Sequence, residues 1–180
     1  MNNQKNTLIQ VRSLAWKNVN RTLVIAQQEV FKKLSIPLMQ DIVDKIDHGS
    51  WMDYHIEKAN SDEIIIFCDI DAFPLTKSFY DKSVRAAEAG YIFGMAQHSN
   101  RSLSAENYAG PMYLSFKKKT WEKLGRPSLK SGHQYDAAEK LSIIARQNNR
   151  LALIQPKFSL YPKWSLNNEN VFGVGTFYGE

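Results

Sequence analysis

The segment Glu63-Ile-Ile-Ile-Phe-Cys-Asp-Ile-Asp-Ala-Phe-Pro-Leu75 carries the strongest structural signal in this chain. Four bulky apolar residues lead into Cys68, and Pro74 ends the extended segment. A continuous run of β-branched and aromatic residues predicts a strand that is buried on both faces, as in the middle of a parallel sheet.

Two aspartates, Asp69 and Asp71, stand at the carboxyl end of this predicted strand. Because side chains alternate along a strand, both carboxylates point the same way, where they repel each other and are costly to desolvate. A divalent cation that shares its charge with the phosphates of a ligand resolves this cost. Open α/β sheets also bind ligands at the edge formed by the carboxyl ends of their strands, where these aspartates are predicted to lie. The alternative is that the two aspartates satisfy turn amides beside Pro74.

Composition limits the class of protein. The chain has 180 residues, which predicts one domain over residues 1–180. A net charge of +5 suits an anionic ligand such as a nucleotide, and it is too mild to indicate nucleic acid. Cys68 is the only cysteine, which excludes an internal disulfide. We find no signal peptide and no apolar run of membrane-spanning length, and we expect a cytoplasmic protein.

Apolar spacing and turn residues indicate that strands alternate with helices, which predicts an α/β sandwich with a largely parallel sheet. Asn18 or Asn20, Ser50, and Thr76 or Ser78 are expected to cap the first three helices. Strands are predicted over 7–15, 36–43, 64–69, 91–97, 112–116 and 151–161, helices over 23–34, 51–59, 78–90, 121–125 and 136–148, and a turn at 109–111.

Paired aspartates after a hydrophobic strand are typical of two enzyme groups. Phosphatases of the haloacid-dehalogenase type have a Thr or Val two residues beyond the second aspartate, where this chain has Phe73. They also require a later pair of acidic residues, whereas Asp81 and Asp136 are isolated. We therefore reject the phosphatase interpretation.

The segment from Ile66 to Leu75 resembles the strand and Asp-x-Asp signature of the nucleotide-diphospho-sugar transferases of the GT-A fold. Residues 48–53, 108–113, 121–125 and 135–139 resemble the segments around that signature, so the resemblance spans roughly residues 36–176. It implies a Rossmann-like α/β/α sandwich with a mostly parallel central sheet.

The resemblance implies a metal-dependent glycosyltransferase that uses a nucleotide-sugar donor and a sugar, lipid or protein acceptor. Asp71 would bind Mn²⁺ or Mg²⁺ directly, and Asp69 would contact the ribose or bind the metal indirectly. The metal would act as a Lewis acid on the nucleoside-diphosphate leaving group.

Three further residues are candidates for the donor site. Asp53 would hold the base or ribose, with an exposed helical aspartate as the alternative. His48 would face the donor phosphates, with a plain loop residue as the alternative. Gly110, before Pro111, would let a sugar approach the main chain, and an ordinary turn explains it equally well.

Asp136 is the candidate general base, which would take the proton of the acceptor hydroxyl if the enzyme inverts the anomeric carbon. Asp136 and Glu139 also have the spacing of a capping box at a helix start. The two interpretations stay open together, because one residue can do both.

Two departures from the family pattern are evident. No histidine follows His133 as a late metal ligand, so we expect weak metal binding until donor phosphates complete the shell. The chain is also short ahead of the aspartate strand, which fits a minimal domain or a homo-oligomer whose second subunit completes the acceptor region. The alternatives are a catalytically silent binding relative and a nucleic-acid-binding domain, and scattered basic residues disfavour the latter.

Overall fold

The computed structural model describes residues 7–99, 101, 106–159 and 176–178. Strands and helices alternate over residues 9–97, as the sequence predicts. In order they are β1 (Ile9–Trp16), α1 (Arg21–Lys33), β2 (Met39–Val43), α2 (His48–Lys58), β3 (Ile64–Asp69), α3 (Lys77–Glu88), β4 (Ile92–Gln97), β5 (Tyr108–Lys117), α4 (Lys118–Lys123), α5 (Glu139–Gln147), β6 (Leu151–Ile154), β7 (Pro156–Ser159) and β8 (Thr176–Tyr178).

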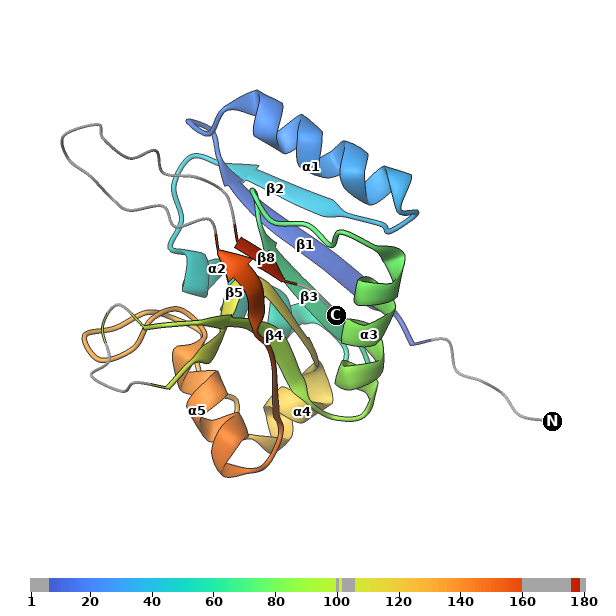
Figure 1. Cartoon of the computed structure of the whole chain (residues 1–180). Helices are drawn as coiled ribbons and strands as arrows, with labels where there is room; N and C mark the ends of the chain where they lie inside the picture. Colours follow the sequence, from blue (N-terminus) through green and yellow to red (C-terminus); the bar gives the residue numbers. More distant parts are fainter. Residues whose placement is uncertain (1–6, 100, 102–105, 160–175, 179–180) are drawn as a thin grey trace.

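The described residues form a six-stranded, mostly parallel sheet in the order β2-β1-β3-β5-β4-β6 (Figure 1). β1 pairs in parallel with β2 and β3, and β4 pairs in parallel with β6. β5 runs antiparallel between β3 and β4. A separate two-stranded sheet joins β7 and β8. The predicted mostly parallel sheet is confirmed.

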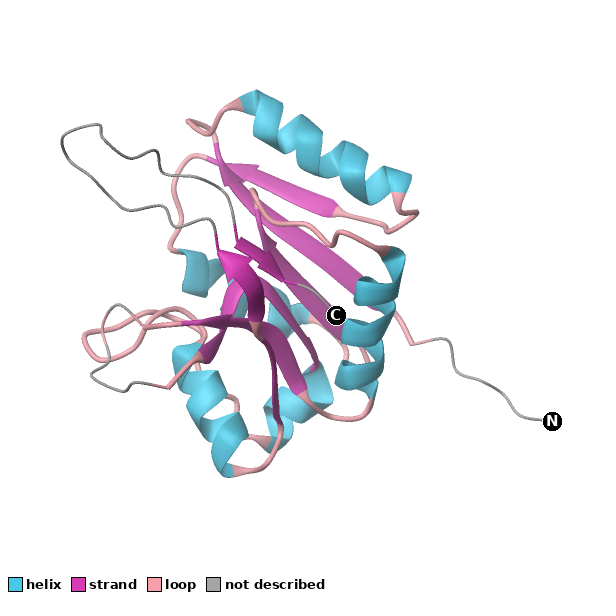
Figure 2. Cartoon of the chain, in the orientation of Figure 1, coloured by secondary structure: helices cyan, strands magenta, loops and turns pink. Residues whose placement is uncertain are grey.

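The aspartate strand β3 lies at the centre of this sheet, and its side chains divide between two cores. Ile64, Ile66 and Cys68 pack on the face that α1 and α3 cover. Ile65 and Phe67 pack on the other face, against α2, α4 and α5. All five side chains are fully buried. Helices therefore cover both faces (Figure 2), which confirms the predicted α/β/α sandwich.

Helix starts follow local capping chemistry. Asn20 accepts a hydrogen bond from Thr22 N before α1, and Thr76 accepts one from Phe79 N before α3, as predicted. The predicted start of α2 is wrong. Asp47, not Ser50, is its N-cap, and its side chain accepts a hydrogen bond from the amide of Ser50. α2 therefore begins three residues early, at His48.

The predicted turn at 109–111 is also wrong, because Gly110 and Pro111 lie inside β5. Beside them the pairing with β4 is irregular: Met95 pairs with Gly110, whereas Gly94 pairs with Leu114. Proline has no N–H to donate to a sheet, and such an irregularity is where a strand tolerates it. The dipeptide marks a bulge rather than a chain reversal.

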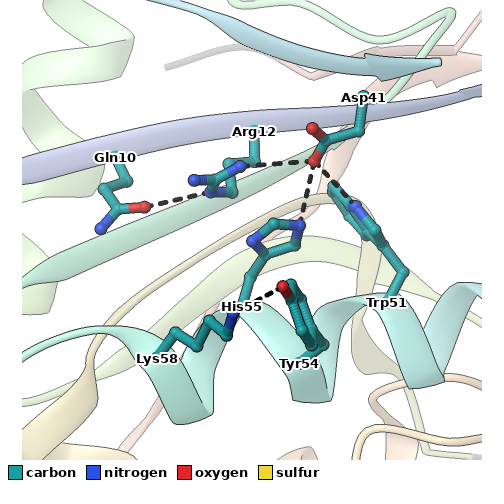
Figure 3. A network of polar contacts seen from close by, with 7 residues as sticks. All are labelled: Gln10, Arg12, Asp41, Trp51, Tyr54, His55 and Lys58. Atoms are coloured by element: carbon teal, nitrogen blue, oxygen red, sulfur yellow. Dashed lines mark hydrogen bonds and ion pairs between the residues drawn. The ribbon is translucent and has the colours of Figure 1, made fainter.

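Helix α2 is held against β1 and β2 by a polar network around Asp41 (Figure 3). The Asp41 Oδ2 atom lies 2.9 Å from Trp51 Nε1, 2.9 Å from His55 Nε2 and 3.3 Å from Arg12 Nη1. Arg12 comes from β1, Asp41 from β2, and Trp51 and His55 from α2. The network fixes the helix whose first turn carries His48.

Among the described residues, no helix is long and apolar enough to cross a membrane.

Candidate functional site

Five strands, β1, β2, β3, β4 and β6, run in one direction, so their carboxyl ends share one edge of the sheet. β5 runs the other way and begins at that edge with Tyr108. Open α/β sheets bind ligands at this edge. Asp69, His48 and Tyr108 are all brought there by the strand directions.

Asp69 is the last residue of β3 and pairs with Leu14 of β1. Its side chain is 35% exposed, and its Oδ1 atom lies 3.6 Å from His48 Nδ1. Burial raises the pKa of Asp69, the nearby His48 lowers it, and the charge of Asp71 raises it again, so that the net change is upward. The sheet edge therefore holds a carboxylate that a cation would stabilise.

Gln27 of α1 stabilises the turn after Asp69 by hydrogen bonds. The Gln27 Nε2 atom donates to the carbonyl oxygens of Asp69, at 2.7 Å, and Ala72, at 2.8 Å. Gln40 of β2 in turn donates to Gln27 Oε1 at 3.0 Å. Gln27 is buried, so this amide fixes the loop that carries Asp71.

Asp71 is exposed within that loop. Among the described residues, no backbone amide donates a hydrogen bond to the carboxylate of Asp69 or Asp71. The turn is stabilised instead by Gln27 and by the Ala72 N–H, which donates to Asp69 O at 3.0 Å. The alternative in which both aspartates serve turn amides therefore has no support in this loop.

No group of three or more His, Cys, Asp or Glu side chains in the described part of the chain is placed to hold a metal ion. A dedicated protein cage is thus absent from those residues. Mg²⁺ is commonly held by one or two carboxylates, with waters and substrate phosphates as its other ligands. Asp69 and Asp71 fit that second arrangement, in which the donor completes the shell.

His48 is the first residue of α2, where unpaired backbone N–H groups favour an anion. Its side chain is 25% exposed, and its Nε2 atom is buried without a hydrogen-bond partner among the described residues. The next residue, Gly49, contacts the backbone of another segment: a Cβ there would lie 2.4 Å from Lys130 Cα. The His-Gly pair therefore combines a side chain close to Asp69 with a close backbone packing contact.

Asp53 has a different environment from the one expected of a donor ligand. One of its carboxylate oxygens accepts from Ser128 Oγ at 2.7 Å, and the other accepts from Leu129 N at 2.8 Å. Together with Gly49, it ties α2 to the segment 128–130. Its donor-binding role stays a prediction.

Gly110 is buried within β5. A Cβ at this position would lie 2.0 Å from Gln97 Oε1, so the Gln97 side chain fills the space that a larger residue would need. This close approach explains the glycine. A contact with the donor stays a prediction, and Gly110 is left out of the donor site.

Asp136 lies on the other side of the same edge, with its side chain 19% exposed and its Oδ1 atom 3.7 Å from Arg101 Nε. The predicted helix start at Asp136 is wrong, because α5 begins at Glu139 and Ala138 before it has φ 65°. Half of the capping box is present: the Asp136 N–H donates to Glu139 Oε2 at 2.7 Å. Asp136 thus lies just ahead of the helix.

Tyr108 lies near both acidic sides, and sequence reasoning did not single it out. The residue is 2% exposed. Burial raises the pKa of Tyr108 strongly, and the charges of Asp136, Glu139 and Asp69 raise it further. No local pattern in the sequence reveals this position, which depends on the antiparallel direction of β5.

Sequence comparisons match the chain to no protein-family model and to no curated protein. A structural comparison matches it to the crystal structure of 4-diphosphocytidyl-2C-methyl-D-erythritol synthase from Anaerococcus prevotii, over 93% of this chain and 92% of that chain. The TM-score is 0.45 and the identity 8%, values at which the likeness carries no argument.

Proposed function

We propose that this chain is a metal-dependent glycosyltransferase, which moves a sugar from a nucleotide-diphosphate donor to an acceptor hydroxyl. One observation carries the proposal: Asp69 ends β3 with its side chain partly buried beside His48, and the exposed Asp71 follows in the loop, at the carboxyl edge of the sheet where Tyr108 begins β5 near Asp136. A sugar transfer of this kind needs acidic groups in two roles: carboxylates that bind a cation beside the donor phosphates, and a carboxylate that accepts the proton of the acceptor hydroxyl. The resemblance of Ile66–Leu75 to the Asp-x-Asp signature supports the same function.

On the donor side, Asp71 and Asp69 would hold Mn²⁺ or Mg²⁺ with the diphosphate. The ion supplies Lewis acidity for the departing nucleoside diphosphate. Asp71 is exposed and can reach a ligand directly, whereas Asp69 is partly buried beside His48. The first turn of α2 and His48 face the same edge and would orient the donor phosphates.

On the acceptor side, Asp136 would take the proton of the acceptor hydroxyl. The acceptor oxygen forms a bond to the anomeric carbon, and the bond from that carbon to the diphosphate oxygen breaks. The electron pair of the broken bond leaves with the nucleoside diphosphate. This balance describes an inverting transfer, the case for which Asp136 is the base.

A second candidate is a catalytically silent relative that binds a nucleotide or carbohydrate without turnover. Two observations favour it: no histidine follows His133, and the described residues contain no three-ligand metal cage. The intact pair Asp69 and Asp71 favours the enzyme.

Calorimetry with UDP, GDP and CMP sugars, with and without Mn²⁺, tests the donor site. We expect one donor class to bind with Mn²⁺, and Asp71→Ala to weaken its binding at least about tenfold, since it removes a metal ligand. Asp81→Ala, which changes an exposed aspartate of α3 paired with Lys77, is the matched control and should bind normally. The proposal fails if no donor binds, or if Asp71→Ala binds as tightly as wild type.

Turnover separates the two candidates. Release of nucleoside diphosphate from the bound donor identifies the enzyme, and binding without release identifies the silent relative. Asp136→Asn should lower turnover by about 10²–10⁴-fold while the melting temperature stays close to wild type. Full turnover with a lower melting temperature would leave Asp136 a structural role only.

A further inference from the structure

Two residues of α2, one helical turn apart, contact the same segment, residues 128–130. One carboxylate oxygen of Asp53 accepts from Ser128 Oγ at 2.7 Å, and the other accepts from Leu129 N at 2.8 Å. At Gly49 a Cβ would lie 2.4 Å from a Cα atom of this segment, so the two backbones are in close contact there. Because residues four apart lie on one face of a helix, a single face of α2 makes both contacts.

The same segment leads to Asp136 through a loop that two backbone hydrogen bonds close. Ala138 N donates to Leu129 O at 3.0 Å, and Gly132 N donates to Tyr135 O at 2.9 Å. Leu129 is fully buried and Ala138 is 1% exposed, so this end of the loop is anchored in the core. Asp136 lies two residues before Ala138. A displacement of Leu129 would therefore displace Asp136 as well.

Helix α2 also adjoins the donor side of the proposed site. It begins at His48, whose Nδ1 atom lies 3.6 Å from Asp69 Oδ1. Its first turn thus contacts the donor side, and five residues further along Asp53 binds the segment that leads to Asp136. One helix therefore connects the two sides of the proposed site.

The Asp53 carboxylate is the side-chain group that makes this connection. Hydrogen bonds to a charged acceptor are stronger than those between neutral groups. Without the carboxylate, the N–H of the buried Leu129 would lose its acceptor, which is a costly state for a backbone donor. Ser128 Oγ also accepts from Lys130 N at 3.2 Å, so the hydroxyl that Asp53 binds orders the next part of the segment.

We infer that Asp53 is a positioning residue, which fixes the segment 128–138 against α2 and thereby sets the distance between Asp136 and the donor side. The inference rests on the proposed function, since Asp136 is the base of that reaction. A small displacement of a catalytic group lowers the rate of the chemical step and need not weaken binding. A direct contact of Asp53 with the donor is the alternative, and its loss would weaken binding instead.

The first test compares binding with turnover in Asp53→Ala, using the UDP, GDP or CMP sugar that wild type binds in the presence of Mn²⁺. At a temperature where every variant is folded, kcat for release of the nucleotide should fall roughly tenfold, while the donor Kd stays within about twofold of wild type. Glu57→Ala is the matched control and should keep both values, since it removes an exposed carboxylate one turn later in α2. An unchanged kcat, or a donor Kd raised about tenfold, overturns the inference.

A conservative variant keeps the test sharp if Asp53→Ala folds poorly. The amide of Asp53→Asn can accept from Leu129 N and donate to Ser128 Oγ, so this variant should keep kcat within about threefold of wild type. Ser128→Ala removes one of the two contacts and should lower kcat by less than Asp53→Ala. The double variant should lose no more than Asp53→Ala alone. Additive losses, or an equal loss in Asp53→Asn and Asp53→Ala, overturn the inference.

Hydrogen exchange tests the same connection without substrate. In Asp53→Ala the amides of 128–138 should exchange at least about tenfold faster than in wild type, whereas those of α3, on the opposite face of the sheet, should change less. Unchanged exchange over 128–138 overturns the inference, whether or not wild type turns over a donor. Faster exchange together with a wild type that turns over no donor overturns the proposed function instead, so the two failures are distinguishable.

Discussion

Asp69 shows the conflict between stability and function at a single residue. Its carboxylate is only 35% exposed and lies near the charge of Asp71, and both conditions disfavour its charged form. Burial raises the pKa of Asp69 in the folded state. Its contribution to stability is therefore fully present when the pH is below the pKa of the unfolded state, and it is lost as the pH rises through the pKa of the folded state. At neutral pH the charged carboxylate of Asp69 therefore lowers the stability of the ligand-free protein.

We predict that Asp69→Asn raises the melting temperature of the ligand-free protein by about 1–3 °C at neutral pH, because it removes a partly desolvated charge. The same variant should lose the stabilisation that donor and Mn²⁺ give to wild type. Scanning calorimetry measures both. Asp71→Asn is the control: its side chain is exposed, so it should lose the ligand effect with little change in the ligand-free melting temperature. A lower melting temperature for Asp69→Asn would contradict the argument.

At the scale of elements, helix α2 shows how far local sequence signals go. The predicted helix body is confirmed, yet Ser50 was expected to cap a helix that starts at residue 51, whereas the helix begins at His48 and contains Gly49. The glycine is there because the segment 128–130 packs against the helix, a contact from about eighty residues away in the sequence. No local pattern contains that information.

The same limit applies to β5 and α5. Gly110-Pro111 has the composition of a turn, but its position at a bulge depends on the pairing with β4. Asp136 and Glu139 have capping-box spacing, but Ala138 with φ 65° delays the helix to Glu139. By contrast, β3 was predictable, because a strand buried on both faces is continuous in its apolar residues. Local sequence patterns therefore predict the interior of a helix or strand better than they predict the segments that it contacts.

We predict that Gly49→Ala destabilises the protein by about 1–3 kcal/mol, since the new methyl group would overlap the backbone of Lys130 and Leu129. Urea unfolding followed by circular dichroism measures the loss. Gly132→Ala is the control and should be close to neutral, because no atom lies within 4 Å of a Cβ there. Equal stability of the two variants would mean that α2 does not pack on segment 128–130 as described.

The network around Asp41 should make α2 sensitive to pH. Burial and the charge of Arg12 lower the pKa of His55, with a smaller contribution from Lys58, and together they outweigh the attraction of Asp41. Because the folded pKa is below the unfolded value of 6.5, His55 contributes stability that is present above that pH. The contribution is lost as the pH falls through the folded pKa.

We therefore predict that the wild-type free energy of unfolding decreases from about pH 7.5 to about pH 5.5, and that His55→Gln flattens this slope. Urea titrations at several pH values give the slope. His55→Gln should also be less stable at every pH, because it disturbs the contacts of Asp41. His133→Gln, at an exposed position, is the control and should keep the wild-type slope. An unchanged slope in His55→Gln would exclude His55 as the source.

At the scale of the whole molecule, the site depends on the order and direction of strands. Asp69 ends β3, Tyr108 begins the antiparallel β5, and Asp136 precedes α5, yet the charges of Asp69 and Asp136 both raise the pKa of Tyr108 at one edge. The sequence predicted Asp69 and Asp136 as separate candidates from their local patterns. It did not show that Tyr108 lies near both of them, because that proximity needs the order β3-β5-β4 in the sheet.

The same strand order should govern local stability. β3 pairs with β1 and β5 and is buried on both faces, whereas β2 has a partner on one side only among the described strands and exposes 40% of Met39 and 55% of Ile42. We predict that amides of 64–68 exchange hydrogen only through global unfolding, while those of 39–43 exchange at a lower free energy through local opening. Hydrogen exchange with mass spectrometry measures both segments.

The same hydrogen-exchange experiment, repeated with ligand, also tests where the donor binds. If donor and Mn²⁺ bind at the carboxyl edge, exchange should slow in peptides covering 69–76 and 106–110, which contain Asp71 and Tyr108. Peptides of β2 should change less, because only its carboxyl end reaches that edge. Buffer free of divalent cations with the donor alone is the control and should protect 69–76 weakly, since the two carboxylates would then face the phosphates without a cation. Protection spread evenly over the chain would show stabilisation without a site at this edge.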